Sequence, residues 1–228
     1  MRWIGAALVL AATAAAGEER PLPVRASITL NRDGAVYYVE GRQKIAWGTE
    51  INVHKRIEIV GRGDDAVLEV AGALNVIGIP EGYCYLSNLR IELAPRFRLL
   101  RLYHVLCRDG GGIFVPEGKP ATGTVVIENG ELLRKVKLDL TMRSGKLRLL
   151  NTMFFHPVHI TAVPEEGKSR ATLKVDIISN FLQPLRPGAK DERSSYSGFV
   201  EGFFLTGAHK ALLRKINKKP LCLSGKPK

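Results

Sequence analysis

Five stretches of this chain share one pattern, a β-forming run interrupted at a fixed position by an amide or imidazole side chain. They read Cys84-Tyr-Leu-Ser-Asn88-Leu-Arg-Ile91, Leu100-Arg-Leu-Tyr-His104-Val-Leu-Cys107, Val125-Val-Ile-Glu-Asn129-Gly-Glu-Leu132, Leu147-Arg-Leu-Leu-Asn151-Thr-Met-Phe154 and Asp176-Ile-Ile-Ser-Asn180-Phe-Leu-Gln183. The central residues are 16, 25, 22 and 29 positions apart. These intervals are too short for a helical crossover at every step, and they fit one turn of a coil of strands.

Large aliphatic side chains recur two places before each central residue. They are Leu86, Leu102, Ile127, Leu149 and Ile178. Since side chains alternate across a strand, this column is expected to point inward, and the apolar alternation continues beyond the central residue. The sequence therefore predicts stacked strands around one continuous interior.

The central residues themselves are expected to make a bend in each turn. Asn tolerates left-handed backbone angles, and its amide can bond peptide groups exposed at a bend or the same amide in the next turn. The hypothesis is one internal file made by Asn88, His104, Asn129, Asn151 and Asn180. The alternative is an antiparallel sandwich with these residues in hairpin turns, and it has a single hairpin signal, Asn129-Gly130.

A strand with closely spaced glycines, Ile57-Glu-Ile-Val-Gly-Arg-Gly63, precedes the regular copies, and Gly61 stands where later copies have Asn. Over about residues 45 to 183 the rung pattern resembles right-handed parallel β-helix proteins of the pectate-lyase-like superfamily. The resemblance implies an all-β chain folded as a single-stranded right-handed parallel β-helix, that is, a β-solenoid.

The chain divides into four expected segments. Residues 1–16 have a positive head, an apolar run and an Ala14-Ala15-Ala16 tripeptide, which together indicate a secretory signal peptide. Residues 20–50 are expected to form N-terminal cap strands, and residues 51–207 the parallel β-helix. Residues 208–228 are expected to form a short C-terminal helix that ends in a basic tail.

The expected export of the chain and its net charge together limit the classes of partner to be expected. No later apolar run is long enough to span a bilayer, so a secreted or periplasmic protein with no transmembrane segment is expected. The chain carries 34 Lys and Arg against 22 Asp and Glu, a net charge of +12. That surplus favours an anionic polysaccharide or envelope surface as partner. Nucleic acid fits an exported protein least and is not expected, and the chain is expected to be a monomer.

Three cysteines, Cys84, Cys107 and Cys222, allow at most one disulfide. Cys84 and Cys107 lie at different offsets in neighbouring copies and are not expected directly above each other. We expect both to be buried thiols that pack as small hydrophobic side chains, whereas Cys222 near the tail can be paired or free.

Five side chains are predicted to share one outer face of the strands. They are Tyr85, Arg101, Tyr103, Glu128 and Arg148. An aromatic ring can stack on a sugar and an arginine can pair with its carboxylate, so this face is the leading ligand-binding candidate. An ordinary mixed solvent face is the alternative.

The resemblance also implies two catalytic chemistries to look for. Hydrolytic members of the superfamily use clustered Asp residues on successive rungs, and no such cluster is visible. Lyase members bind calcium through acidic side chains and use a basic residue to remove a sugar proton. The candidates here are Arg108 and Asp109, with Glu128 and Arg148, and Ca²⁺ is implied in that case alone.

Other reactive centres find little support in the sequence. His156 and His159 fall on opposite sides of a strand, so no metal site is expected. No Gly-x-Ser-x-Gly motif is present, and a nucleophile made from Cys107 and His104 would be buried. The leading hypothesis is therefore an exported β-helix protein that binds an acidic polysaccharide, with cleavage of that polymer left open. The rival is a non-catalytic structural or adhesion scaffold of the cell envelope.

Overall fold

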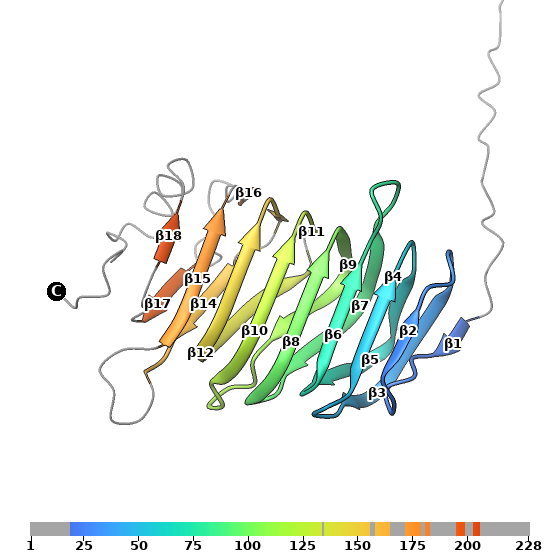
Figure 1. Cartoon of the computed structure of the whole chain (residues 1–228), viewed down its shortest axis with the longest axis horizontal. Coiled ribbons are helices and arrows are strands. Elements are labelled where there is room, and N and C mark those ends of the chain that lie inside the picture. The colour runs from blue at the N-terminus through green and yellow to red at the C-terminus, as the bar shows by residue number, and fades with distance from the viewer. Residues whose placement is uncertain are drawn as a thin grey trace, which may run out of the picture.

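The computed structural model describes residues 19–133, 135–155, 158–164 and 172–178, together with the backbone of short strands at 181–182, 195–198 and 203–205. In this part of the chain, 18 strands form one coiled sheet (Figure 1), and every ladder between named strands is parallel. The predicted parallel β-solenoid is confirmed, and the antiparallel sandwich is wrong.

The strands fall into three files, which we call faces A, B and C. Face A, in the foreground of Figure 1, consists of β2 (Ile28–Leu30), β4 (Glu50–His54), β6 (Ala73–Ile77), β8 (Arg96–Tyr103), β10 (Ala121–Glu128), the second half of β12 (Lys137–Leu150), β15 (Thr172–Ile178) and β18 (Phe203–Leu205). Each strand pairs with the one before and the one after it, so face A is a continuous parallel sheet.

Long strands bend to supply the other two faces. Face B consists of β1 (Glu19–Pro21), the first halves of β3 (Val36–Ile45), β5 (Glu58–Val70), β7 (Cys84–Leu93) and β9 (Val105–Phe114), then β11 (Glu131–Leu132), β13 (Met153–Phe154) and β16 (Phe181–Leu182). Face C consists of the second halves of β3, β5, β7 and β9, the first half of β12, β14 (Val158–Ala162) and β17 (Ser195–Gly198).

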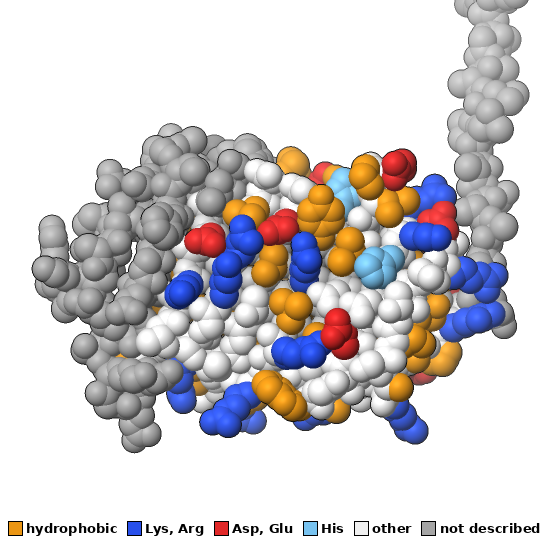
Figure 2. Space-filling model, in the orientation of Figure 1, with side chains coloured by type: hydrophobic (Ala, Val, Ile, Leu, Met, Phe, Trp, Pro, Cys, Tyr) orange, Lys and Arg blue, Asp and Glu red, His pale blue; other side chains and the backbone are white. Residues whose placement is uncertain are grey.

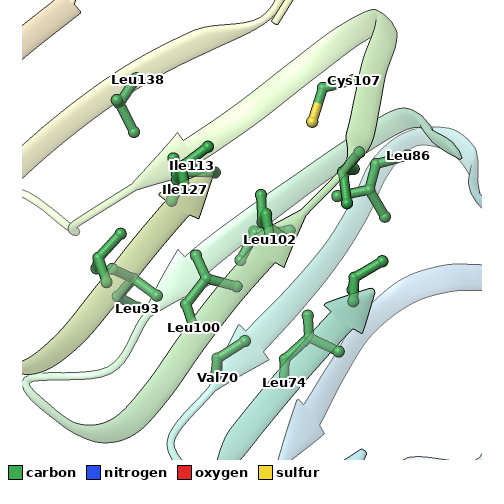
Figure 3. Packing of buried hydrophobic residues seen from close by; sticks show 14 of the residues in the cluster. Val70, Leu74, Leu86, Leu93, Leu100, Leu102, Cys107, Ile113, Ile127 and Leu138 are labelled. Atoms are coloured by element: carbon green, nitrogen blue, oxygen red, sulfur yellow. The ribbon is translucent and has the colours of Figure 1, made fainter. Parts of the chain in front are cut away.

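The core runs along the axis of the coil as columns of aliphatic side chains. Leu102, Ile127 and Leu149 lie opposite one another on β8, β10 and β12, and all three are buried. Figure 3 shows such side chains from successive turns packed against each other. Burying one leucine or isoleucine contributes about 1.5–3 kcal/mol, so the inward column predicted from the sequence carries much of the stability.

The fifth copy of the sequence pattern is displaced by one residue from its predicted alignment. Leu149 lies opposite Ile177 rather than Ile178. The reason is side-chain alternation, because this register buries Val175 and Ile177 and leaves Asp176 outside. The predicted register would have turned Asp176 into the apolar interior.

The bend between faces A and B uses the predicted left-handed backbone. His104, Asn129 and Asn151 have φ angles of 53°, 51° and 46°, and they follow strands paired in register, so they occupy the same corner of successive turns. Asn88 also has a positive φ of 49°, but it lies between faces B and C beside Gly61. A single file that includes Asn88 is therefore wrong, and Asn180 lies outside the described residues.

The amide ladder exists at a different place from the predicted one. Asn151 is exposed and Asn129 half-buried, so this corner is not an internal file. Instead, Asn75 on β6 donates from Nδ2 to Oδ1 of Asn52 on β4 at 2.8 Å, and these residues lie opposite each other on face A. At the corner, Asn is suitable because it tolerates a positive φ. The hydrogen bond between stacked amides lies on face A instead.

The described residues cover only some of the predicted segments of the chain. Strands β1 to β4, within residues 19–54, pair in parallel with the following turns and are continuous with the coil, so a distinct cap over 20–50 is not confirmed. The signal peptide at 1–16 and the helix and tail at 208–228 lie outside the described residues. The described residues contain no helix long and apolar enough to cross a membrane.

Replacing Asn129 by Val should destabilise the solenoid, because a β-branched residue at φ 51° is strained. We expect a loss of about 1–2 kcal/mol in the free energy of unfolding. Asn129→Gly should cost little, since glycine adopts positive φ without a Cβ clash. Denaturant unfolding followed by circular dichroism measures both, and equal losses in the two variants would contradict the role assigned to this corner.

Candidate functional site

Four of the five predicted face residues meet on face A. Arg101 and Tyr103 lie on β8, Glu128 on β10 and Arg148 on β12. Tyr103 lies opposite Glu128, and Arg101 and Arg148 lie on either side of Val126. They point outward because the alternate positions, Leu100 and Leu102 among them, fill the core. Figure 2 shows basic and acidic side chains interspersed on this face.

The charged groups of this face form what we call the arginine cluster, made of Arg101, Glu128, Arg148 and Asp176. Glu128, whose side chain is 15% exposed, lies between the two guanidinium groups, 3.8 Å from Arg101 and 3.7 Å from Arg148. Nε of Arg148 is also 3.3 Å from Asp176. These distances exceed those of charge-assisted hydrogen bonds, about 2.7–2.9 Å.

Two N–H donors of the arginine cluster make no hydrogen bond. The Nε atoms of Arg101 and Arg148 are buried and have no hydrogen-bond partner, since the contact of Arg148 with Asp176 lacks hydrogen-bond geometry. The guanidinium of Arg101 lies 6.0 Å from the centre of the Tyr103 ring. The cluster thus places two guanidinium groups and an aromatic ring together. Because the Nε atoms are buried, the terminal nitrogens of these partly exposed side chains, 43% for Arg101 and 35% for Arg148, are the donors that an external acceptor can reach.

An earlier part of face A carries a tighter network that the sequence pattern did not indicate. Glu50 on β4 pairs with Arg98 on β8, and it accepts a hydrogen bond from Asn75 at 3.2 Å. The hydrogen bond from Arg98 lowers the pKa of Glu50, with a further contribution from Asn52. Residues 50–53 precede the five copies, so the repeated pattern gave no signal for them.

Tyr85 does not belong to face A. It lies on β7 in face B, opposite Glu58 and Leu106, and its ring lies 4.8 Å from the guanidinium of Arg108. The prediction that Tyr85 shares a face with Arg101 and Tyr103 is wrong. The cause is the misplacement of Asn88, because aligning Asn88 with His104 also aligned Tyr85 with Arg101.

Arg108 and Asp109 form a separate network at the corner between faces B and C. Arg108 donates from Nε to Oγ of Ser87 at 2.9 Å and from a terminal nitrogen to Glu58 at 3.0 Å. Ser87 in turn donates to Glu58 at 2.5 Å. The hydrogen bond to Glu58 raises the pKa of Arg108. Asp109, exposed and with φ 63°, lies 3.4 Å from Arg108.

The polar side chains of Ser87, Glu58 and Arg108 in this second network hydrogen-bond to one another. Ser87 is buried and bonded to both neighbours, so it is a stacking element between turns rather than an exposed nucleophile. Arg108 and Asp109 therefore lie on another side of the coil from Glu128 and Arg148. The four residues considered together for a lyase-type centre are not brought to one site.

An aromatic stack links faces A and B. The rings of Tyr83 and His104 are parallel within 4° with centroids 4.3 Å apart, and the Tyr83 hydroxyl donates to Glu131 at 3.1 Å. Burial and the bond to Glu131 raise the pKa of Tyr83. His104 thus uses its ring in packing at the bend.

The cysteines within the described residues are buried thiols, as predicted. Cys84 lies opposite Val105, and Cys107 opposite Leu86, so the two sulfur atoms are not directly stacked, and neither is in a disulfide. Burial raises the pKa of Cys84 and raises that of Cys107 to about 12. Cys222 lies outside the described residues.

Within the part of the chain that the structure describes, no three His, Cys, Asp or Glu side chains gather closely enough to hold a metal ion. His159 lies on β14 in face C, and His156 is outside the described residues. Comparison of this chain with protein-family models, curated proteins and solved structures found no match.

Cys84 and Cys107 should not react with an aromatic disulfide reagent in the native protein at pH 8, because both sulfur atoms are buried and the thiols remain protonated. The measurement uses a Cys222→Ser variant, so that the remaining two thiols are counted by released thiolate absorbance. We expect two thiols to be titrated in denaturant. Rapid labelling of either thiol without denaturant would contradict their placement in the core.

Proposed function

We propose that this chain is an exported right-handed β-helix protein of the pectate-lyase-like type that binds an acidic polysaccharide across face A. The proposal rests on one observation, the two partly exposed guanidinium groups of Arg101 and Arg148 held side by side over Glu128. The signal-peptide pattern of residues 1–16 and the net charge of +12 support a secreted or periplasmic protein with an anionic partner.

The chemistry of binding follows from the geometry of the arginine cluster. A guanidinium group presents its donors in a planar fork that matches a carboxylate or sulfate ester, and a ligand can pair with it in a bidentate manner. Glu128 holds both guanidinium groups near the surface, so their positions are fixed before a ligand arrives. Tyr103, half-buried beside Arg101, offers a ring edge or plane to a sugar.

Binding without cleavage fits the described residues better than catalysis does. A lyase of this type needs carboxylates for calcium beside a basic residue. Asp109 and Glu128 lie at different corners of the coil, and each is occupied by an arginine. The second candidate is a non-catalytic envelope scaffold. It is supported by the same continuous parallel sheet, but it binds no soluble polymer.

Arg101→Gln/Arg148→Gln should weaken retention on an immobilised uronate polymer, because the substitutions remove two charges and the two partly exposed guanidinium groups of the arginine cluster. We expect about a tenfold loss of affinity, the sum of contacts worth about 0.5–1 kcal/mol each. Arg25→Gln/Arg32→Gln is the control, since both arginines are exposed and the loss of charge is equal. Equal weakening in the two variants would show unspecific attraction and argue against a face A site.

Incubating the purified protein with uronate polymers, with and without Ca²⁺, separates binding from lyase activity. We expect binding with no absorbance from unsaturated sugar ends, for the reason given by the separated carboxylates. Calcium-dependent growth of that absorbance would replace the binding proposal with an enzyme. A chain that binds none of the polymers would favour the scaffold.

A further inference from the structure

A groove of about 600 Å³ lies at the corner between faces C and A, away from the arginine cluster. Its walls come from the connections that follow β7 and β9, from the starts of β8 and β10, and from the bend within β12. The residues that the argument uses are Pro95, Arg96, Lys119, Thr122, Arg143 and Ser144. Lys119 lies in the connection between β9 and β10, which runs over residues 115–120.

Three consecutive turns of the coil each contribute one cation to the groove. Arg96 lies opposite Thr122, and Thr122 lies opposite Ser144, so these residues mark the same level of three neighbouring turns. Lys119 precedes Thr122 in the middle turn, and Arg143 precedes Ser144 in the third. Neighbouring turns are about 4.8 Å apart, so the three turns span roughly 10 Å along the axis.

Arg143 reaches the groove because the sheet is irregular at that level. Ala121 lies opposite Met142 and Thr122 opposite Ser144, so Arg143 is the extra residue of a β-bulge. A bulge redirects a side chain that a regular strand would have placed differently. Gly145, two residues after Arg143, has φ 109°, and a Cβ there would lie 1.9 Å from the carbonyl oxygen of Gly123. The close approach of the turns beside the groove thus requires glycine.

The groove differs electrostatically from the arginine cluster. No carboxylate of the described residues lines it, and within those residues none of Arg96, Lys119 and Arg143 has an ion pair or side-chain hydrogen bond with another residue. All three side chains are exposed. The Ser144 hydroxyl donates to Thr122 Oγ1 at 3.1 Å, which leaves the Thr122 hydroxyl hydrogen as a neutral donor in the same groove.

We propose that this groove is a second site for the same class of ligand, in which an anionic polysaccharide lies along the solenoid axis and places its acidic substituents against Arg96, Lys119 and Arg143. This inference rests on the proposed function. The ligand carries an oxyanion on a sugar. This oxyanion is either a uronate carboxylate or a sulfate ester. Because face A cations are partly neutralised by Glu128 and Asp176, the groove provides the larger share of charge attraction.

The test compares three variants of the full chain for binding to polygalacturonate and to dextran sulfate, measured by calorimetry at fixed salt. The groove variant is Arg96→Gln/Lys119→Gln/Arg143→Gln. The control is Arg25→Gln/Arg32→Gln/Lys137→Gln, which removes three exposed cations elsewhere. The third is the face A variant Arg101→Gln/Arg148→Gln, and circular dichroism and thermal unfolding confirm that each variant is folded.

The expected result is about a tenfold or greater loss of affinity in the groove variant, with a smaller loss in the control. The polymer with the larger loss identifies the substituent that the groove accepts. Unchanged affinity in the groove variant, together with weaker binding by the face A variant, would overturn the groove and leave the proposed function standing. Equal losses in the groove variant and its control would also overturn it. No binding of the unmodified chain to either polymer, or binding to anionic vesicles alone, would overturn both.

Discussion

Parallel stacking of turns in register is the constraint on which the rest of this structure depends. Each turn can satisfy its peptide groups only by pairing with the turns before and after it, and a shift of one residue would move every inward side chain to the outside. The column of Leu102, Ile127 and Leu149 fixes that register from within. Stacking then determines the outer surface, because residues at equal positions in successive turns become neighbours although they lie more than 20 residues apart.

The two basic regions use this constraint differently. The arginine cluster lies on a regular part of face A, where Glu128 is shared by Arg101 and Arg148 at similar distances. The groove lies where the register shifts, and no carboxylate of the residues that the structure describes lines it. A regular strand face favours neighbouring opposite charges, since like charges directly opposite are destabilising. A bulge and a loop relieve that requirement, which explains why the unneutralised cations are found at the corner.

The sequence was sufficient for the fold and for part of the candidate site. The repeated aliphatic position predicts the parallel solenoid, and the spacing of Arg101 and Tyr103 from His104 places them correctly beside Glu128 and Arg148. Asn88 misled the alignment because two different corners need positive φ, and Asn meets that need at either one. Because Asn88 was misaligned, Tyr85 was also predicted on the wrong face. The groove required the structure, since the bulge at Arg143 leaves no mark in the sequence pattern.

Disulfide formation between cysteines placed at Thr124 and Lys146 tests the stacking most directly. These residues lie opposite each other on the outer side of β10 and β12, so T124C/K146C should oxidise readily in a chain whose native cysteines are replaced by Ser or Ala. We expect a cross-link for this pair and little for T122C/K146C, because Thr122 lies opposite Ser144 and is shifted along the strand from Lys146. Efficient cross-linking of the shifted pair, or none for T124C/K146C, would contradict the register from which both proposed sites are derived.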